Sequence, residues 1–481
     1  MASLAAPPEF RHTYARSLPG LAATWKADES PNPQLIVANN ALAGELGIDP
    51  TWLNSTEALH LFSGNDMAQG LERYALAYAG HQFGSYSPRL GDGRALLVGE
   101  FDDLNGHKWD LHLKGSGRTP FARGGDGKAT LGPMLREYLM GEAMHALGIP
   151  TTRALAVITT GDLAMRERPL PGAILVRVAD SHLRVGTFQY AASLGDLDDL
   201  RTLADYAIGR HYPGLADDSD RYMKFLGAVI ERQAHLVADW MLVGFIHGVM
   251  NTDNVTISGE TIDYGPCAFM DVVDPNTVFS SIDEGGRYAY GRQPSITQWN
   301  LARFAETLLP LIATNPDDAI APATQALEEF PEIFSRRWHA GMNRRLGLST
   351  TVDGDDDLAN NLIALLQERR LDLISTMRSL SNHLRGEDIG LAEWTARWET
   401  RLELEHASSE EMISRLEAAN PIYVPRNHLV EEALSSAVAG DLNKFDALLK
   451  RVTNPYQHVD NAERYSQPGD PGPGYRTYCG T

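Results

Sequence analysis

The chain changes character once along its length, and this change limits the folds open to it. Between residues 76 and 190, glycine is dense, and the short apolar runs ALLVGEF, WDLHLKG, ALAVITT and AILVRVA predict strands. One predicted helix, Pro133 to Leu147, interrupts them. From about residue 191 the apolar residues take helical spacing, most clearly in SDRYMKFLGAVIERQAHLVADWMLVGFIHG. Strands followed by long helices predict a two-lobed α+β protein.

This pattern divides the chain into four segments. Residues 1–75 are expected to form an irregular, partly helical N-terminal extension, and residues 76–190 a strand-rich N-lobe with one helix. Residues 191–450 are expected to form a larger helical C-lobe, with further helices at roughly 297–313, 355–384, 390–404 and 427–451. Within it, NVTISGETIDYG is predicted to be a β-hairpin. Residues 451–481, rich in glycine and proline, are expected to be a flexible tail.

Charge and cysteine content exclude several classes of protein. The chain has 42 Lys and Arg against 63 Asp and Glu, a net charge of −21, so neither nucleic acid nor an anionic membrane is expected as a partner. No apolar run approaches the ~20 residues of a membrane span, and no signal peptide is apparent. We therefore expect a cytoplasmic monomer. Two cysteines, Cys267 and Cys479, exclude a disulfide framework and a four-cysteine zinc site.

Two patterns in the strand-rich lobe place cations where an anion is one explanation. Gly91 and Gly93 precede Arg94, as in a phosphate-binding loop, although an ordinary hairpin turn has the same pattern. Arg177 lies inside an apolar strand and Arg184 near the start of the next segment. Arginines at such positions need a partner, which is either a bound anion or a structural salt bridge.

A third pattern couples a strand to the lobe's predicted helix. Lys114 ends a strand, and Glu137 lies 23 residues later on the helix. A strand lysine paired with a helix glutamate is how kinase-type folds hold nucleotide phosphates. Arg118, Arg123 and Lys128 lie among glycines between the two, so this stretch is either an anion site or a solvated loop.

Several polar side chains suited to metal binding or proton transfer lie in the segment FIHGVMNTDNVTISGETIDYGPCAFMD. Asn254 and Asp263 offer the oxygen ligands that suit Mg²⁺ on a polyphosphate. Asp253 is the nearest candidate for a general base. The alternative is that these are the buried polar groups of a turn.

Residues 247–254, HGVMNTDN, have the length of the protein-kinase catalytic loop H-R-D-L-x-x-x-N, and Asp-Tyr-Gly at 263–265 resembles the kinase Asp-Phe-Gly. Lys114 and Glu137 resemble the kinase strand lysine and helix glutamate, in the same order. Val249 stands where a kinase has its catalytic aspartate. By this comparison the chain is a pseudokinase with a two-lobed, kinase-like fold.

Longer stretches resemble the selenoprotein O family over nearly the whole chain, among them KGSGRTPFARGGDGKATLGPMLREYLMGEAMHALGIPTTRAL, NTDNV, IDYGPCAFMD, YAYGRQPSITQWNLARFAETLLPL and NPIYVPRNHLVEEAL. The resemblance implies transfer of AMP from ATP to Ser, Thr or Tyr hydroxyls of proteins, with self-modification included, and release of pyrophosphate. It also implies Mg²⁺ or Mn²⁺ as cofactor, and a nucleotide held in the reverse sense from a kinase.

The resemblance assigns roles to individual residues. Asp253 is implied as the proton acceptor, and Asn254 and Asp263 as metal ligands. The implied nucleotide-binding residues, with Glu137 as structural support, are Gly91, Gly93, Arg94, Lys114, Asp126, Gly127, Arg177, Arg184 and Asp263.

The C-terminus departs from the family pattern. Many relatives carry selenocysteine near that end, where this chain has Cys479. We hypothesise a reversible disulfide between Cys267 and Cys479 that closes the tail over the catalytic loop. The alternative is a buried Cys267 and an idle Cys479.

Three other activities remain open. UMP transfer from UTP is a close variant, because no residue identifies the base. A kinase with an unusual catalytic loop is the second, and Val249 counts against it. A non-catalytic nucleotide-binding scaffold is the third. The sequence names neither the acceptor nor the preferred metal.

Overall fold

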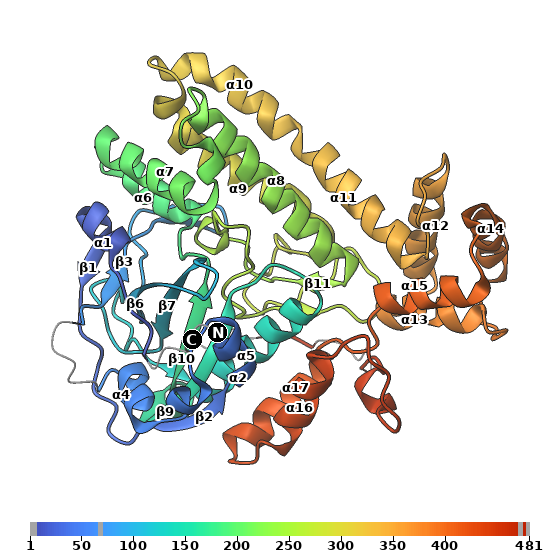
Figure 1. The fold of residues 1–481 in the computed structure, drawn as a ribbon, viewed down its shortest axis with the longest axis horizontal. Coiled ribbons are helices and arrows are strands. Elements are labelled where there is room, and N and C mark those ends of the chain that lie inside the picture. Colours follow the sequence, from blue (N-terminus) through green and yellow to red (C-terminus); the bar gives the residue numbers. More distant parts are fainter. Residues whose placement is uncertain (1–6, 66–70, 470–474, 478–481) are drawn as a thin grey trace.

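The computed structural model describes residues 7–65, 71–469 and 475–477. Its N-terminal part is an antiparallel sheet with strand order β1-β3-β6-β7-β10-β9-β2, to which β8 is added beside β10 (Figure 1). The central strands are those that the sequence predicts: β6 (Ala95–Asp102), β7 (Lys108–Lys114), β9 (Arg153–Met165) and β10 (Pro169–Ala179). The short strands are β1 (Ala22–Thr24), β2 (Gln34–Ala38), β3 (Tyr74–Leu76) and β8 (Ala129–Thr130).

The expected N-terminal extension contributes to this sheet. Strands β1 and β2 both come from residues 1–75 and lie at its two edges. The helices of the same stretch are α1 (Thr13–Ser17), α2 (Asn40–Glu45), α3 (Pro50–Leu53) and α4 (Thr56–Ser63). The segment is therefore partly helical, as predicted, but its extended parts are paired strands.

Alternation along β7 and β10 separates apolar from charged side chains. His112 of β7 lies opposite Arg177 of β10 in the antiparallel register, and Lys114 lies two residues further on. Residues two apart share a face of a strand, so these three cationic or titratable side chains point to the same side. Leu113 and Val176 point to the other side, into a buried apolar cluster with residues of α2, α3 and α4.

Helix α5 (Leu131–Ala146) crosses the charged face, close to the predicted range, and Gly148 with φ +78° follows its end. The predicted helix at 427–451 is two helices, α16 (Asn427–Val438) and α17 (Asn443–Val452), because Gly440 adopts φ +96° between them. Both pack on α5 (Figure 1), and Tyr138 and Phe445 lie in the shared apolar core.

The helical part is built on α8 (Arg221–Leu242), whose apolar face is buried along most of its length. Helices α9 (Gln293–Ile312), α10 (Pro316–Glu328) and α11 (Phe330–Arg345) lie beside it (Figure 1). Helices α6 (Val185–Ser193) and α7 (Leu197–His211) adjoin the sheet, and the far end carries α12 (Asp355–Glu368), α13 (Leu373–His383), α14 (Ala392–Leu402) and α15 (Ser409–Ala419). The helix predicted at 355–384 is thus two, separated at Arg370, which has φ +54°.

The β-hairpin predicted at NVTISGETIDYG does not form. Thr256 makes an isolated bridge with Arg184, and Thr261 makes one with Thr151, so the two halves pair with different segments. The buried Glu260 explains this, because its carboxylate accepts hydrogen bonds from the Asp180 backbone N–H at 3.2 and 3.0 Å. Strands β11 (Phe245–Ile246) and β12 (Ala268–Phe269) pair on either side of the loops that enter the site.

A short hairpin that the sequence did not indicate lies beside the 3₁₀ turn Thr252–Asn254. Strand β4 (Gly80–Gln82) pairs with β5 (Ser85–Ser87), and β4 contacts this turn. Within the described ranges, no helix is both long and apolar enough to cross a bilayer.

Candidate active site

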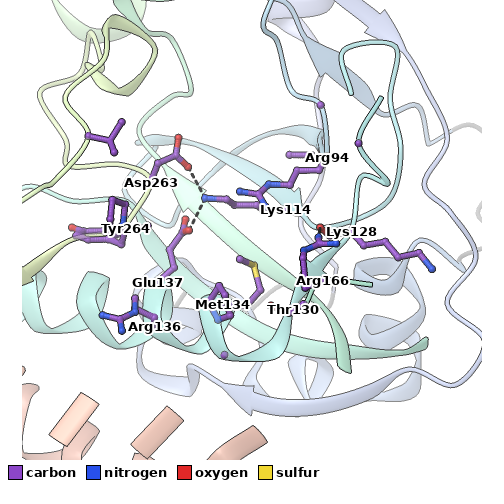
Figure 2. Close-up of a pocket in the computed structure, with 18 of the residues that line it drawn as sticks. Arg94, Lys114, Lys128, Thr130, Met134, Arg136, Glu137, Arg166, Asp263 and Tyr264 are labelled. Atoms are coloured by element: carbon purple, nitrogen blue, oxygen red, sulfur yellow. Dashed lines mark hydrogen bonds and ion pairs between the residues drawn. The ribbon is translucent and has the colours of Figure 1, made fainter. Parts of the chain in front are cut away.

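A cavity of about 920 Å³ opens between the sheet, α5 and the loops of the helical part (Figure 2). Its lining brings together all the residues predicted to bind nucleotide or metal or to accept the proton: Gly91, Gly93, Arg94, Lys114, Asp126, Gly127, Glu137, Arg177, Arg184, Asp253, Asn254 and Asp263. Cys267 is buried in the apolar core beneath α5 and does not line the cavity. Cys479 lies outside the described residues.

Lys114 is held between two carboxylates (Figure 2). Its Nζ lies 2.6 Å from Glu137 Oε2 and 2.6 Å from Asp263 Oδ1. The lysine ends β7 and the glutamate lies on α5, so the pairing between strand and helix expected from the sequence is present. Charge-assisted bonds of this length fix the lysine's position in the cavity.

Asp263 is surrounded by cations. Arg177 Nη1 lies 2.7 Å from its Oδ1, and Arg184 Nη1 lies 3.1 Å from its Oδ2, in addition to Lys114. Burial opposes ionisation, but these three cations together hold the pKa of Asp263 well below its usual range. The residue also has φ +62°, a backbone conformation that costs roughly 1–3 kcal/mol in a non-glycine residue.

Asp92, the residue between Gly91 and Gly93, is part of this charge network. It is buried, and its Oδ2 accepts hydrogen bonds from His112 Nε2 at 2.9 Å and from the Leu76 backbone N–H at 3.1 Å. Arg177 Nη2 lies 3.1 Å from His112 Nδ1 and donates to it. Burial lowers the pKa of His112, which agrees with a neutral ring carrying its proton on Nε2. The Gly-Asp-Gly turn is therefore tied to Arg177.

The sequence did not single out Asp92 and His112. The signal was present in strand alternation, because His112 lies two residues before Lys114 and so shares its face of β7. Gly91 is required by packing: it has φ +72°, and a Cβ there would lie 2.4 Å from Phe121 Cγ. This packing brings the turn against the neighbouring loop that also lines the cavity.

Asp253 is buried beside Asp263 and has few partners. Arg184 Nη1 donates to its backbone carbonyl at 2.9 Å, and Gln82 Nε2 lies 3.5 Å from its Oδ2. Its Oδ1 has no hydrogen-bond partner among the residues that the structure describes. Burial raises the pKa of Asp253 to about 6, and Arg184 opposes the rise. An aspartate with this pKa is ionised in most molecules at neutral pH.

Asn254 has one amide atom committed to structure. Its Nδ2 donates to the Val249 carbonyl at 2.9 Å, which leaves Oδ1 as the amide atom suited to a cation. Over the described ranges there is no cluster of three or more His, Cys, Asp or Glu that could hold a metal. Asn254 and Asp263 therefore fit a hard cation whose other ligands are phosphate and water oxygens.

The glycine-rich loop is ordered by specific contacts. Asp126 accepts hydrogen bonds from Arg166 Nη1 at 2.8 Å and from the Lys128 N–H at 3.0 Å. Gly127 has φ +71°, and a Cβ there would lie 2.2 Å from the Gly117 carbonyl carbon. Arg123 and Lys128 line the cavity, whereas Arg118 does not.

The C-terminal region supplies part of the outer wall, which sequence patterns did not reveal. Arg136 of α5 pairs with Glu431 of α16, and Tyr475 OH donates to the same glutamate at 2.9 Å. Thr477 pairs with Ser280, and its Oγ1 donates to the Pro266 carbonyl at 2.7 Å. Within the expected flexible tail, Thr477 is therefore hydrogen-bonded to the segment after Asp-Tyr-Gly, and Tyr475 to α16.

Comparisons with known proteins identify the family of this chain. A family model described as protein adenylyltransferase SelO matches residues 9–453. A relative from Mycolicibacterium smegmatis, named protein nucleotidyltransferase YdiU, is 54% identical over 479 residues and is aligned over 97% of both chains. Relatives of the same name from Geobacillus kaustophilus and Cereibacter sphaeroides are 54% and 53% identical, over 93% and 98% of this chain and 94% and 99% of their own. The chain therefore belongs to the protein adenylyltransferase SelO family.

Proposed function

We propose that this protein transfers AMP from ATP to Ser, Thr or Tyr hydroxyls of proteins and releases pyrophosphate. The observation that carries the proposal is that three cations surround Asp263 in a cavity that Asp253 also lines. These cations are Lys114, Arg177 and Arg184. The names of the family and of its relatives support this activity. A kinase-like fold is part of the proposal, since a strand lysine, a helix glutamate and Asp-Tyr-Gly meet in one cavity.

The cations have a role both without and with the nucleotide. In the structure they neutralise Asp263, and a polyphosphate offers them more negative charge than one carboxylate does. When bound, Mg²⁺ or Mn²⁺ at Asn254 and Asp263 supplies further neutralisation of the phosphates. Positioning and charge stabilisation then account for most of the catalysis.

Asp253 is the residue suited to the proton transfer. Its carboxylate, which lines the cavity, would accept the acceptor hydroxyl's proton as that oxygen bonds to the α-phosphorus. The bond from the α-phosphorus to the bridging oxygen then breaks, and pyrophosphate leaves with the electron pair. Val249 also lines the cavity and carries no group able to accept a proton, so the position of the kinase aspartate cannot fill this role.

The deciding experiment uses ATP labelled at either the α- or the γ-phosphate, and α-labelled UTP, each with Mg²⁺ or Mn²⁺. We expect α-label and an AMP-sized mass on an acceptor protein or on the enzyme itself, both lost in Asp263→Ala. Incorporation of γ-label would instead identify a kinase. Nucleotide binding without any transfer would identify a scaffold, and preferential labelling from UTP would identify a uridylyltransferase.

We also propose that Cys267 and Cys479 form a reversible disulfide. The hydrogen bond from Thr477 to Pro266 supports this, because it joins residues two before Cys479 and one before Cys267. Burial raises the pKa of Cys267 to about 12, so the Cys479 thiolate is the better nucleophile. Two thiols lose two protons and two electrons to an oxidant such as glutathione disulfide. Identical non-reducing mobility of wild type and Cys479→Ser after oxidation would exclude the bond.

A further inference from the structure

The β4–β5 hairpin is fixed to the catalytic loop by hydrogen bonds. The His81 backbone N–H donates to Thr252 Oγ1 at 2.7 Å, and the Phe83 N–H donates to Asn251 Oδ1 at 3.0 Å. These bonds attach the hairpin on either side of Gln82, whose amide lies near Asp253. The outer face of the hairpin therefore has a defined position relative to the proposed proton acceptor.

Glycines bring the hairpin into direct contact with that residue. A Cβ on Gly80 would lie 2.6 Å from Asp253 Oδ1, so only glycine leaves space for the carboxylate. A Cβ on Gly186 of α6 would lie 2.2 Å from the Ala79 carbonyl oxygen, which shows equally close packing just before β4. A polypeptide bound on the hairpin would thus lie next to the site of proton transfer.

Exposed aromatic side chains cover this face. Phe83 and Tyr86 are 37% and 45% exposed, although both are large apolar side chains. The Tyr86 ring lies 5.0 Å from the His81 ring, which in turn lies 5.3 Å from the ring of Trp299 on α9. Aromatic residues and arginine are enriched at the centres of protein interfaces, where they contribute most of the binding energy.

Arg287 adds a positive charge to the same face. Its guanidinium lies 4.8 Å from the centre of the Trp299 ring and 5.8 Å from that of Tyr288. It makes no ion pair with any carboxylate of the described residues, although the chain carries a net charge of −21. Asp283 in the same loop is committed to the backbone N–H groups of Arg287 and Tyr288. The charge of Arg287 is thus available to a bound acid.

Arg303 provides an internal comparison. Its guanidinium lies 5.2 Å from the centre of the same Trp299 ring, but Arg303 pairs with Glu306 at 2.6 Å. Two arginines therefore contact one tryptophan, and only Arg303 has a carboxylate partner. Arg303 is the matched control for any experiment on Arg287.

We propose that Phe83, Tyr86, Arg287 and Trp299, the hairpin platform, bind the acceptor protein as an extended segment with Asp or Glu near its hydroxyl residue. This inference rests on the proposed function and adds a recognition surface to it. Phe83 and the 55% exposed Ile282 both line the cavity, so the apolar part of the platform continues to its opening. The acceptor's acid pairs with Arg287, and its neighbouring side chains pack on the rings.

The test separates binding from transfer. Fluorescent Ser-containing peptide pools, with Asp, Ala or Lys fixed at each flanking position, are titrated against wild type, Arg287→Glu, Arg303→Glu and Tyr86→Ala. The titration includes Mg²⁺ and an ATP analogue with a methylene group between the α- and β-phosphorus, which blocks transfer. A parallel assay with α-labelled ATP measures incorporation, and calorimetry with the analogue verifies that each variant retains its nucleotide site.

We expect wild type to bind Asp over Lys by roughly fivefold at one or two positions, as for a partly exposed charge pair. Arg287→Glu should reverse this preference, and Arg303→Glu should keep it. Tyr86→Ala should weaken the binding of all peptide pools and raise the KM for the peptide in the transfer assay. The proposal of a hairpin platform is wrong if wild type shows no preference for Asp over Lys, or if Arg287→Glu keeps the wild-type preference. A reversed preference without incorporation of label from ATP in wild type refutes the proposed function and leaves the platform standing.

Discussion

Two buried groups of charges in this molecule are built in opposite ways. In the cavity, the carboxylate of Asp263 contacts Lys114, Arg177 and Arg184, and its side chain is 21% exposed. At the start of α16, Arg426 is fully buried and contacts Asp271 and Asp372 at 2.7 Å each. One centre is an acid among cations, and the other is a cation among acids.

The difference shows in where each group lies. In the Arg426 group, Nη2 also donates to the Ser466 carbonyl, and Asp372 accepts the Ser375 N–H at the start of α13, so the group is connected to the surrounding backbone. In the Asp263 group, three cations face Asp263, Glu137 and Asp92, and this group lines the cavity. The Arg426 group does not line the cavity and is suited to stabilising the fold, whereas the cations of the Asp263 group can turn to an anion that enters the cavity.

The largest expected effect comes from neutralising the acid in the cavity. Asp263→Asn should reduce AMP transfer roughly a thousandfold, because it removes the carboxylate that would hold the metal ion neutralising the reacting phosphates. Initial rates with α-labelled ATP measure this. Asp271→Asn, which neutralises an acid of the Arg426 group, should keep most of the activity; equal losses in both variants would end the functional distinction between the groups.

Removing the central cation of the other group should act on folding. Arg426→Met leaves Asp271 and Asp372 buried without their partner, which should lower the free energy of unfolding by about 3–5 kcal/mol. Denaturant unfolding measures the loss, while activity per folded molecule should be unchanged. Arg201→Met, which breaks a surface pair with Asp198, is the control and should change stability by less than about 1 kcal/mol.

Replacing an arginine of the cavity by methionine should lower the free energy of unfolding less than Arg426→Met does. In Arg177→Met, Asp263 keeps Lys114 and Arg184, so unfolding should become easier by only about 1–2 kcal/mol. ATP binding should weaken roughly 30-fold, because a charged donor is lost. Denaturant unfolding and calorimetry measure the two effects. A loss of stability as large as that of Arg426→Met would contradict the asymmetry between the groups.

The smallest expected effect is a change of the free energy of unfolding at acidic pH. Burial opposes ionisation of Glu405, but hydrogen bonds from Ser349 and Thr350 lower its pKa to about 2, below the usual 4.5. A depressed carboxyl pKa stabilises the fold above about pH 4.5, and this contribution is lost as the pH falls towards 2. The stability difference between wild type and Glu405→Gln should therefore narrow over this range. A difference independent of pH would show that Glu405 acts through shape alone.

The sequence predicted the residues of the cavity better than the contacts around them. Lys114, Glu137 and Asp263 follow from motif spacing, and in the structure Lys114 Nζ lies 2.6 Å from a carboxylate oxygen of each acid. The hydrogen bonds that connect Asp92 to Arg177 through His112 were not predicted, because they depend on which strands are neighbours in the sheet. The β4–β5 hairpin was missed because GHQFGSYS is short and shows no clear alternation of apolar residues.

The incorrect predictions have two causes, which are a distant contact that overrides a local pattern and local backbone turns that interrupt helical periodicity. The segment from Val255 to Ile262 alternates like a hairpin, but Glu260 bonds to the distant Asp180 backbone. Helical periodicity continued past Arg370 and Gly440, where the backbone takes positive φ. Periodicity identifies the buried face of α16 and α17 but not their partner, α5.

The packing of α16 and α17 on α5 has a consequence for protein synthesis. Leu135, Tyr138 and Leu139 of α5 share a core with Phe445 and Leu448, which the ribosome adds some 300 residues later. A nascent chain that has emerged only to residue 420 lacks α16 and α17, which cover α5, the helix that carries Glu137. The cavity can therefore assemble only after α16 and α17 have left the ribosome, and chains that terminate before these helices should lack transferase activity.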